Sequence, residues 1–133
     1  MAKKLAVLFG VIFVLVGVLG FIPNPIAGPT GIFQTDGIHN LVHFIIGVVL
    51  LIVAFAAPAK SSAWLTIVGV IYLLLAVLGF LMISHGGMLL GMVTMNMADH
   101  WLHVVLGVVL VVAGMATKGS SRPAMPMGMG MGM

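Results

Sequence analysis

The residues of this sequence best suited to chemistry are histidines at regular spacing. His39 and His43 stand four residues apart, as do Asp99 and His103, with His100 between the latter two. On a helix, residues three or four positions apart share one face. Imidazole binds zinc, copper and haem iron, and it exchanges protons near neutral pH. These two stretches therefore hold the candidate site.

The two histidine stretches belong to a larger internal repeat. Aligning Gly47 with Gly107 superimposes three pairs of polar residues: His39 with Asp99, Asn40 with His100, and His43 with His103. The segment 10–21 aligns with 69–80 at nearly the same offset, and eight of the twelve residues are identical. We therefore expect a parallel duplication in which residues 4–57 and 63–116 form two equivalent helical hairpins.

Four long apolar segments carry these motifs and predict a membrane protein. The 133 residues are 62% hydrophobic and 5% charged, with a mean hydropathy of +1.35, whereas soluble domains contain roughly 25% charged residues. A helix needs about 20 apolar residues to cross a bilayer, where only helices and closed barrels satisfy the backbone. The expected fold class is all-α, a bundle of four transmembrane helices over 4–22, 38–57, 63–83 and 98–116.

The few charged residues predict how this bundle is oriented. With four crossings, all five basic residues fall on one side and both aspartates fall on the other. By the positive-inside rule, both termini are then cytoplasmic, in an inner or plasma membrane. The basic residues are too dispersed for a nucleic-acid site, and the absence of cysteine excludes thiolate ligands. We expect residues 1–117 to form the membrane domain and the Met/Gly/Pro-rich 118–133 to be a disordered cytoplasmic tail.

Small residues recur seven positions apart in all four apolar segments. The pairs are Gly10/Gly17, Gly47/Ala54, Gly69/Ala76 and Gly107/Gly114. A period of seven keeps them on one seam of a left-handed bundle, where they allow close approach of two backbones. If the seams face outward instead, they would serve self-association or contact with other membrane subunits.

Three motifs carry a family resemblance over residues 5–116. They are the segment 31–33 followed by 39–43 and Gly47, the segment 99–103, and the pattern of 10–21. They resemble the small bacterial four-helix membrane proteins numbered 4383 among the domains of unknown function. The resemblance implies a four-helix integral membrane fold and brings no established activity or cofactor. The methionine-rich connection before the fourth helix departs from the family, as does the tail.

Four interpretations of the histidine stretches are open at this point. In the first, the polar side chains only stabilise the bundle. Asp36 and Asp99 would cap the second and fourth helices. His43 and His103 would hydrogen-bond between helices, with Asn40 and Asp99 as orienting partners.

The other three interpretations give the histidines a ligand or a proton. In the second, His43 and His103 hold haem b between helices. In the third, zinc or copper is bound at the end of the bundle that carries the aspartates, and the methionines of the adjoining connection suit cuprous copper. The candidate ligands are His39, His43, Asp99, His100 and His103, with His85 as a further one. In the fourth, the histidines form a proton or solute pathway.

The functional class that we expect is a non-enzymatic membrane protein. The sequence has no Gly-rich phosphate loop, no pair of catalytic carboxylates and no Ser-His-Asp arrangement. The lead hypothesis is a structural or accessory subunit of a membrane assembly, embedded in lipid. The alternative is a haem- or metal-binding membrane protein that uses His43 and His103.

Overall fold

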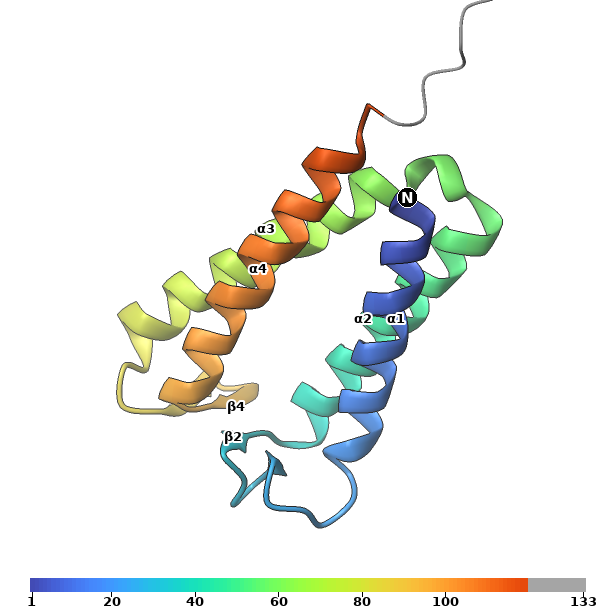
Figure 1. Ribbon diagram of the computed structural model, residues 1–133. Coiled ribbons are helices and arrows are strands. Elements are labelled where there is room, and N and C mark those ends of the chain that lie inside the picture. The colour runs from blue at the N-terminus through green and yellow to red at the C-terminus, as the bar shows by residue number, and fades with distance from the viewer. Residues whose placement is uncertain (120–133) are drawn as a thin grey trace, which may run out of the picture.

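The computed structural model describes residues 1–119. Residues 120–133, which make up most of the predicted tail, lie outside the described residues. The described chain is mostly helical. Its elements are α1 (Ala2–Leu19), β1 (Ala27–Gly28), β2 (Phe33–Gln34), α2 (Gly37–Ala56), η1 (Pro58–Lys60), α3 (Ser61–Met82), β3 (Gly87–Leu89), β4 (Val93–Met95) and α4 (Met97–Thr117). We call the end of the bundle that carries β1–β4 the strand end, and the opposite end the termini end (Figure 1).

The four long helices pack as two hairpins, α1 with α2 and α3 with α4. Glycines make each hairpin tight. A Cβ on Gly47 would lie 2.7 Å from the carbonyl oxygen of Gly10, and a Cβ on Gly69 would lie 2.8 Å from that of Gly107. Such distances leave no room for a methyl group, so the glycine seams join helices within one chain. These contacts lie at corresponding positions of the two predicted repeats.

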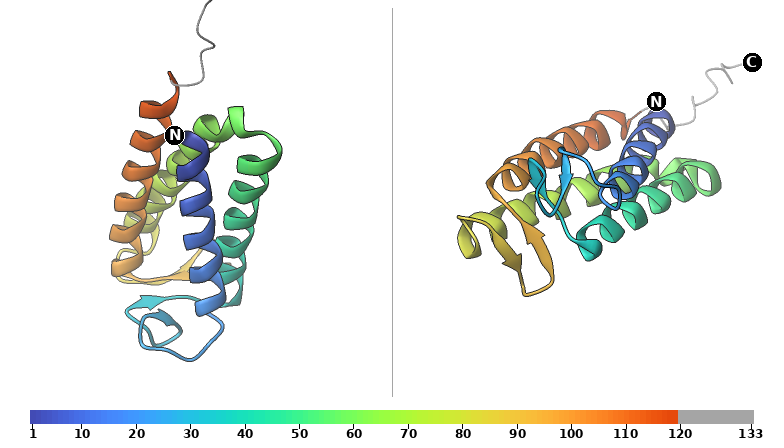
Figure 2. Two further views of the ribbon diagram at one scale, coloured as in Figure 1. Left: turned by 45° about the vertical axis from the view of Figure 1, so that its right-hand side comes forward. Right: turned by 90° about the horizontal axis from the view of Figure 1, so that it is seen from below.

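The two hairpins lean against each other through apolar side chains and separate toward the strand end (Figures 1 and 2). The core between them contains fully buried large residues from all four helices. These residues are Phe13, Leu50, Leu65, Tyr72 and Leu110. At the strand end, β2 and β4 of the two connecting segments lie between the hairpins and close the gap. The first connection contains the parallel pair β1–β2, and the second contains the antiparallel pair β3–β4.

Side chains of the connecting segments decide where several helices begin and end. Asp36 is the N-cap of α2 and accepts a hydrogen bond from the backbone N–H of His39, as the sequence predicts. The N-cap of α4 is Asn96 rather than Asp99, which lies in the first turn and completes a capping box with Asn96. The predicted cap at Asp99 is therefore displaced by three residues, because the side-chain oxygen of Asn96 accepts from the backbone N–H of Asp99 and starts the helix earlier.

The first helix ends earlier than the sequence predicts. The apolar pattern predicts a helix that continues to Ile22, whereas α1 ends at Leu19. The side-chain amide of Asn24 donates to the carbonyl oxygens of Leu19 at 2.9 Å and Ile22 at 2.6 Å. In a longer helix the carbonyl of Leu19 would pair with residue 23, but Pro23 has no backbone N–H, and the amide of Asn24 bonds to this carbonyl instead. The apolar residues 20–22 therefore belong to the first connection.

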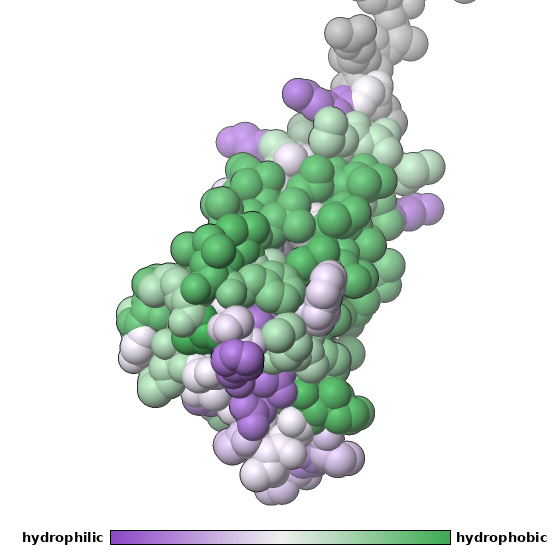
Figure 3. Space-filling view, turned by 90° about the vertical axis from the view of Figure 1, so that its left-hand side faces the viewer, coloured by the Kyte–Doolittle hydropathy of each residue, from purple (hydrophilic) through white to green (hydrophobic). Residues whose placement is uncertain are grey.

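All four long helices are long and apolar enough to cross a membrane. Figure 3 shows apolar side chains in a broad band over the helices, with hydrophilic residues gathered toward the two ends. Large apolar side chains on every long helix are exposed, including Leu15, Phe55, Leu74 and Val112. Such a surface is compatible with lipid and not with water. The chain is therefore a four-span integral membrane protein.

Candidate functional site

Three imidazoles from the two hairpins meet near the strand end. His39 and His43 lie one turn apart on α2, and His103 approaches them from α4. Each ring offers one nitrogen to the group, and these three nitrogens lie within 4.8 Å of one another. The ring centroids of His39 and His43 are 4.9 Å apart, and those of His43 and His103 are 6.1 Å apart. All three side chains are buried, and we call them the histidine cluster.

Hydrogen bonds orient two of the three rings from outside the cluster. His39 donates from Nδ1 to the carbonyl oxygen of Thr94 at 2.7 Å, so its Nε2 keeps a free lone pair. His43 Nδ1 and the hydroxyl of Tyr72 on α3 lie 2.9 Å apart and share a hydrogen bond. His103 Nδ1 is buried and has no hydrogen-bond partner among residues 1–119. Metal-binding histidines have this arrangement, in which the second ring nitrogen is held by a carbonyl or a polar side chain.

Two aspartates tie the hairpins together directly beside the cluster. Asp36, at the start of α2, accepts a hydrogen bond at 2.6 Å from the backbone N–H of Thr94 in β4. Asp99, in α4, accepts one at 3.0 Å from the backbone N–H of Gln34 in β2 and one at 2.8 Å from that of Asn96. Each hairpin thus supplies a carboxylate to the connecting segment of the other. The exchange fixes the relative position of α2 and α4, and therefore of their histidines.

These bonds stabilise the charged form of Asp36. Partial burial raises the pKa of its carboxyl group. The hydrogen bonds from Thr94 and from the backbone N–H groups of His39 and Ile38 outweigh burial and hold the pKa below the ordinary value of 3.8. The strand end therefore presents a fixed negative charge at the start of α2.

Two cavities flank the histidine cluster, and His43 and His103 line both. The α1–α4 cavity has a volume of about 170 Å³ and is lined by Thr35, Asp99 and mostly apolar side chains. The α2–α3 cavity has a volume of about 160 Å³ and is lined by all three imidazoles of the cluster and by Met95. The rings therefore form a wall between two small spaces inside the bundle.

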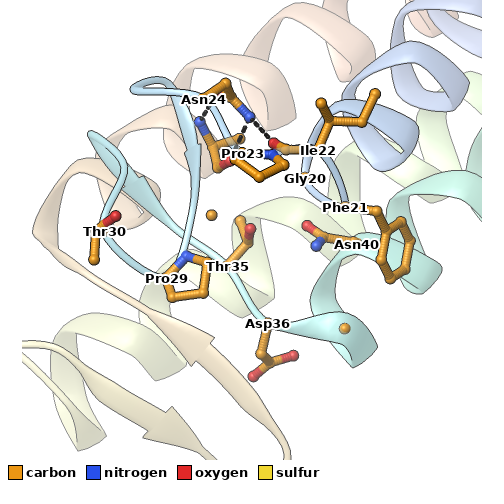
Figure 4. Close-up of a pocket in the computed structure, with 13 residues that line it drawn as sticks. Gly20, Phe21, Ile22, Pro23, Asn24, Pro29, Thr30, Thr35, Asp36 and Asn40 are labelled. Carbon is orange, nitrogen blue, oxygen red and sulfur yellow. Dashed lines mark hydrogen bonds between the residues drawn. The ribbon is translucent and has the colours of Figure 1, made fainter.

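A wider pocket, which we call the basin, lies on the surface of the strand end. It has a volume of about 530 Å³ and is formed by the first connection and the start of α2 (Figure 4). Asn24 holds the connection in shape through hydrogen bonds to several backbone groups. Asp36 and Asn40 line the basin. Thr35 lines both the basin and the α1–α4 cavity.

The structure separates the other predicted ligands from the cluster. His100 points into its own hairpin, where Nε2 donates to the carbonyl oxygen of Ile83 at 3.1 Å and the ring packs against Phe80. Asp99 accepts two backbone hydrogen bonds through Oδ2, and its carboxylate is not part of the group of three imidazoles. His85 is exposed in the second connection. Of the five metal ligands proposed from the sequence, three come together.

Tyr72 is a site residue that the sequence reasoning missed, whereas Met95 is one of the connection methionines that the sequence offers as copper(I) ligands. The internal alignment sets Tyr72 opposite Phe13, so its hydroxyl is the one polar group that the second repeat adds at this position. That difference was a usable signal. Met95 is buried beside the cluster, whereas Met88 and Met92 of the same connection are exposed. Only the pairing of β3 with β4, which the sequence did not predict, separates these methionines.

The site is too small for haem. His39 stacks on His43, and the ring of Tyr72 stands edge-on to His103 with centroids 4.9 Å apart. Both rings occupy space that a porphyrin between His43 and His103 would need. Each flanking cavity is also smaller than the roughly 300 Å³ at the lower end of ordinary ligand pockets. The arrangement suits a single ion.

Comparison with known proteins gives one match. A family model described as "Domain of unknown function (DUF4383)" covers residues 3–116. No curated protein and no solved structure matches the chain.

Proposed function

Because the chain belongs to the DUF4383 family, whose description assigns no activity, we propose a function from the site alone: a membrane protein that binds one copper(I) ion at His39, His43 and His103. The observation that carries the proposal is the convergence of three buried imidazole nitrogens within 4.8 Å. Metal–nitrogen bonds of about 2.0–2.1 Å bring ligand nitrogens to within roughly 4 Å of one another. Closing the site around an ion therefore takes a side-chain shift on the order of 1 Å.

The charge balance of the site favours a monovalent ion. Neutral imidazoles add no negative charge, and the histidine cluster is buried in an apolar bundle. The cost of burying an ion grows with the square of its charge, so a monovalent ion pays about a quarter of the penalty of a divalent one. The nearby carboxylate of Asp99 already accepts two backbone hydrogen bonds. Copper(I) therefore suits this site better than zinc.

Met95 supports the same choice of metal. Its side chain is 1% exposed and lines the α2–α3 cavity together with all three imidazoles. A thioether is a soft, uncharged ligand that favours copper(I) over zinc and over copper(II). Met95 is the candidate fourth ligand from inside the bundle.

The orientation and the non-enzymatic role belong to the same proposal. Lys3, Lys4, Lys60 and Lys118 lie at the termini end, and Asp36 and Asp99 lie at the strand end. By the positive-inside rule, the termini end is cytoplasmic and the strand end faces outward. The histidine cluster then lies in the outer half of the membrane. We propose that the protein acts by holding the ion rather than by catalysing a reaction.

A second candidate function is the structural or accessory membrane subunit that the sequence predicts. The observation that favours it is the set of hydrogen bonds between the hairpins, in which His43 is bonded to Tyr72 and His39 to Thr94. In this account the histidines are polar pins that hold a rigid scaffold. His103 separates the two candidates, because it joins the cluster without making a hydrogen bond of its own through Nδ1.

Copper(I) titration of the purified full chain under reducing, oxygen-free conditions tests the proposal. Wild type, His103→Ala and the exposed control His85→Ala are compared by competition with a copper(I)-specific chelator. We expect His103→Ala to lose one tight copper per chain and His85→Ala to keep it. The methionines of the tail are present in all three proteins, so the difference counts only the site in the bundle. Equal copper content in the three proteins contradicts the proposal and favours the scaffold.

A further inference from the structure

The α1–α4 cavity is lined by two buried residues, Thr35 and His103, each of which has a polar atom without a partner in the described structure. Thr35 is 4% exposed and His103 is 3% exposed, and both line the cavity. The hydroxyl oxygen of Thr35 and Nδ1 of His103 have no hydrogen-bond partner among residues 1–119. A buried polar atom left unpaired destabilises the fold. Two residues with such atoms on one cavity indicate a missing hydrogen-bonding occupant.

Apart from His43 and Asp99, the remaining lining of this cavity is apolar, and it leads to the lipid. α1 contributes Ile12 and Val16, α4 contributes Leu102 and Leu106, and Ile26 comes from the first connection. Ile12 and Ile26 are exposed, so the mouth of the cavity lies between α1 and α4 on the membrane-facing surface. These two helices touch only sparsely. An occupant therefore enters from the bilayer.

The volume of the cavity limits the occupant to one ring. A dry cavity of about 150 Å³ binds benzene, and the α1–α4 cavity measures about 170 Å³. A lipid acyl chain would fill the space but leave Thr35 and His103 unpaired. A ring that carries oxygen substituents fills the space and accepts hydrogen bonds from both side chains.

We propose that the α1–α4 cavity binds the single-ring head of a lipid-soluble quinone, with its apolar tail lying between α1 and α4 in the bilayer. The hydroxyl of Thr35 donates to a carbonyl oxygen of the ring. His103 donates to ring oxygen from Nδ1 and keeps Nε2 for the histidine cluster. The proposal goes beyond copper binding and does not depend on it, because Thr35 and the apolar lining take no part in the metal site.

Calorimetric titration of metal-free full-length protein in detergent tests this proposal. The probe is a benzoquinone with a ten-carbon alkyl tail, and protein-free micelles give the partition background. We expect saturable binding of one quinone per chain. Thr35→Val keeps the volume and removes the hydroxyl, which weakens binding about tenfold, the equivalent of one hydrogen bond. Val16→Phe fills the cavity and abolishes binding.

Leu75→Phe is the matched control, because Leu75 lines the α2–α3 cavity on the other side of the cluster. It places the same bulk in the wrong cavity, and we expect quinone affinity to stay at the wild-type value. Thermal unfolding confirms that each variant is folded before titration. The proposal is overturned if the heat does not saturate, or if Thr35→Val and Val16→Phe bind as wild type does. Because the protein is metal-free, neither result bears on copper.

Discussion

Replacing Tyr72 by Phe is the most informative single change, because it alters the support of the histidine cluster without altering its ligands. The hydroxyl of Tyr72 lies 2.9 Å from His43 Nδ1, and the pair is buried. In a copper complex, His43 would bind the ion through Nε2 and donate from Nδ1 to this hydroxyl. Phe fits the position, since the internal alignment sets Phe13 at the matching place in the first repeat.

The size of the effect follows from two losses. Removing an outer hydrogen-bond partner of a metal-binding histidine lowers metal affinity by about 10- to 100-fold, which corresponds to about 1.4–2.8 kcal/mol. Leaving His43 Nδ1 unpaired inside the bundle costs the fold about 1–3 kcal/mol. Tyr72→Phe therefore lowers both copper(I) affinity and thermal stability.

Competition with a copper(I) chelator measures the affinity, and thermal unfolding of the metal-free protein measures the stability. Ser62→Ala is the matched control, because it also removes a buried hydroxyl. Ser62 donates to the carbonyl oxygen of Gly114 at the termini end, between α3 and α4. We expect Ser62→Ala to reduce stability by a similar amount and to leave copper affinity unchanged. Wild-type affinity in Tyr72→Phe, or an equal loss in Ser62→Ala, would refute the reasoning.

Three further predictions address the fold, its pH dependence and its orientation. Gly47→Ala forces a methyl group into backbone atoms of α1, so thermal unfolding should show a loss of about 1–3 kcal/mol; Gly119→Ala, where nothing lies within 4 Å, should unfold as wild type does. The lowered pKa of Asp36 means that its contribution to stability is complete above the ordinary value of 3.8 and is lost as the pH falls through the lower pKa of the folded state. Unfolding temperatures recorded from pH 6 to pH 2 should show this fall in wild type, and a shallower one in Asp36→Asn. Because the chain has no cysteine, Ala2→Cys and Thr30→Cys each place a single thiol at one end of the bundle. A membrane-impermeant maleimide added to intact cells should label Thr30→Cys alone. Labelling of Ala2→Cys instead would show that the orientation is the opposite of the proposed one.

The sequence was sufficient for the helices and for part of the site. Hydropathy fixed the four spans, and the repeat placed His43 and His103 at matching depths in the second and fourth helices, where the structure brings them together. His39 joins them because it is one turn from His43 on the same face. His100 lies three residues from His103, a spacing that also shares a helix face, but its side chain lies inside its own hairpin. Spacing alone does not say which side of a helix meets the other hairpin.

The remaining part of the site depends on the connecting segments. The hydrogen bonds from Thr94 to Asp36 and from Gln34 to Asp99 join residues more than fifty positions apart. Both donors are backbone groups of very short strands, which have no side-chain signature that a pattern could reveal. The burial of Met95 also depends on a short strand, since β4 turns this one methionine of the methionine-rich connection inward. Local patterns thus predicted the ligands on helices but not what holds or completes them.

X-ray absorption spectroscopy of the copper(I)-loaded full chain tests the central claim most directly. Site-specific signal is obtained as the difference between wild type and His103→Ala, because the tail methionines are common to both. The account predicts that this difference contains imidazole nitrogens, with His39, His43 and His103 each required for it, and that Met95→Leu removes a sulfur contribution while the nitrogens remain. A difference spectrum with no imidazole scattering, or one that survives in the triple alanine variant of the histidine cluster, would contradict a copper site between the two hairpins.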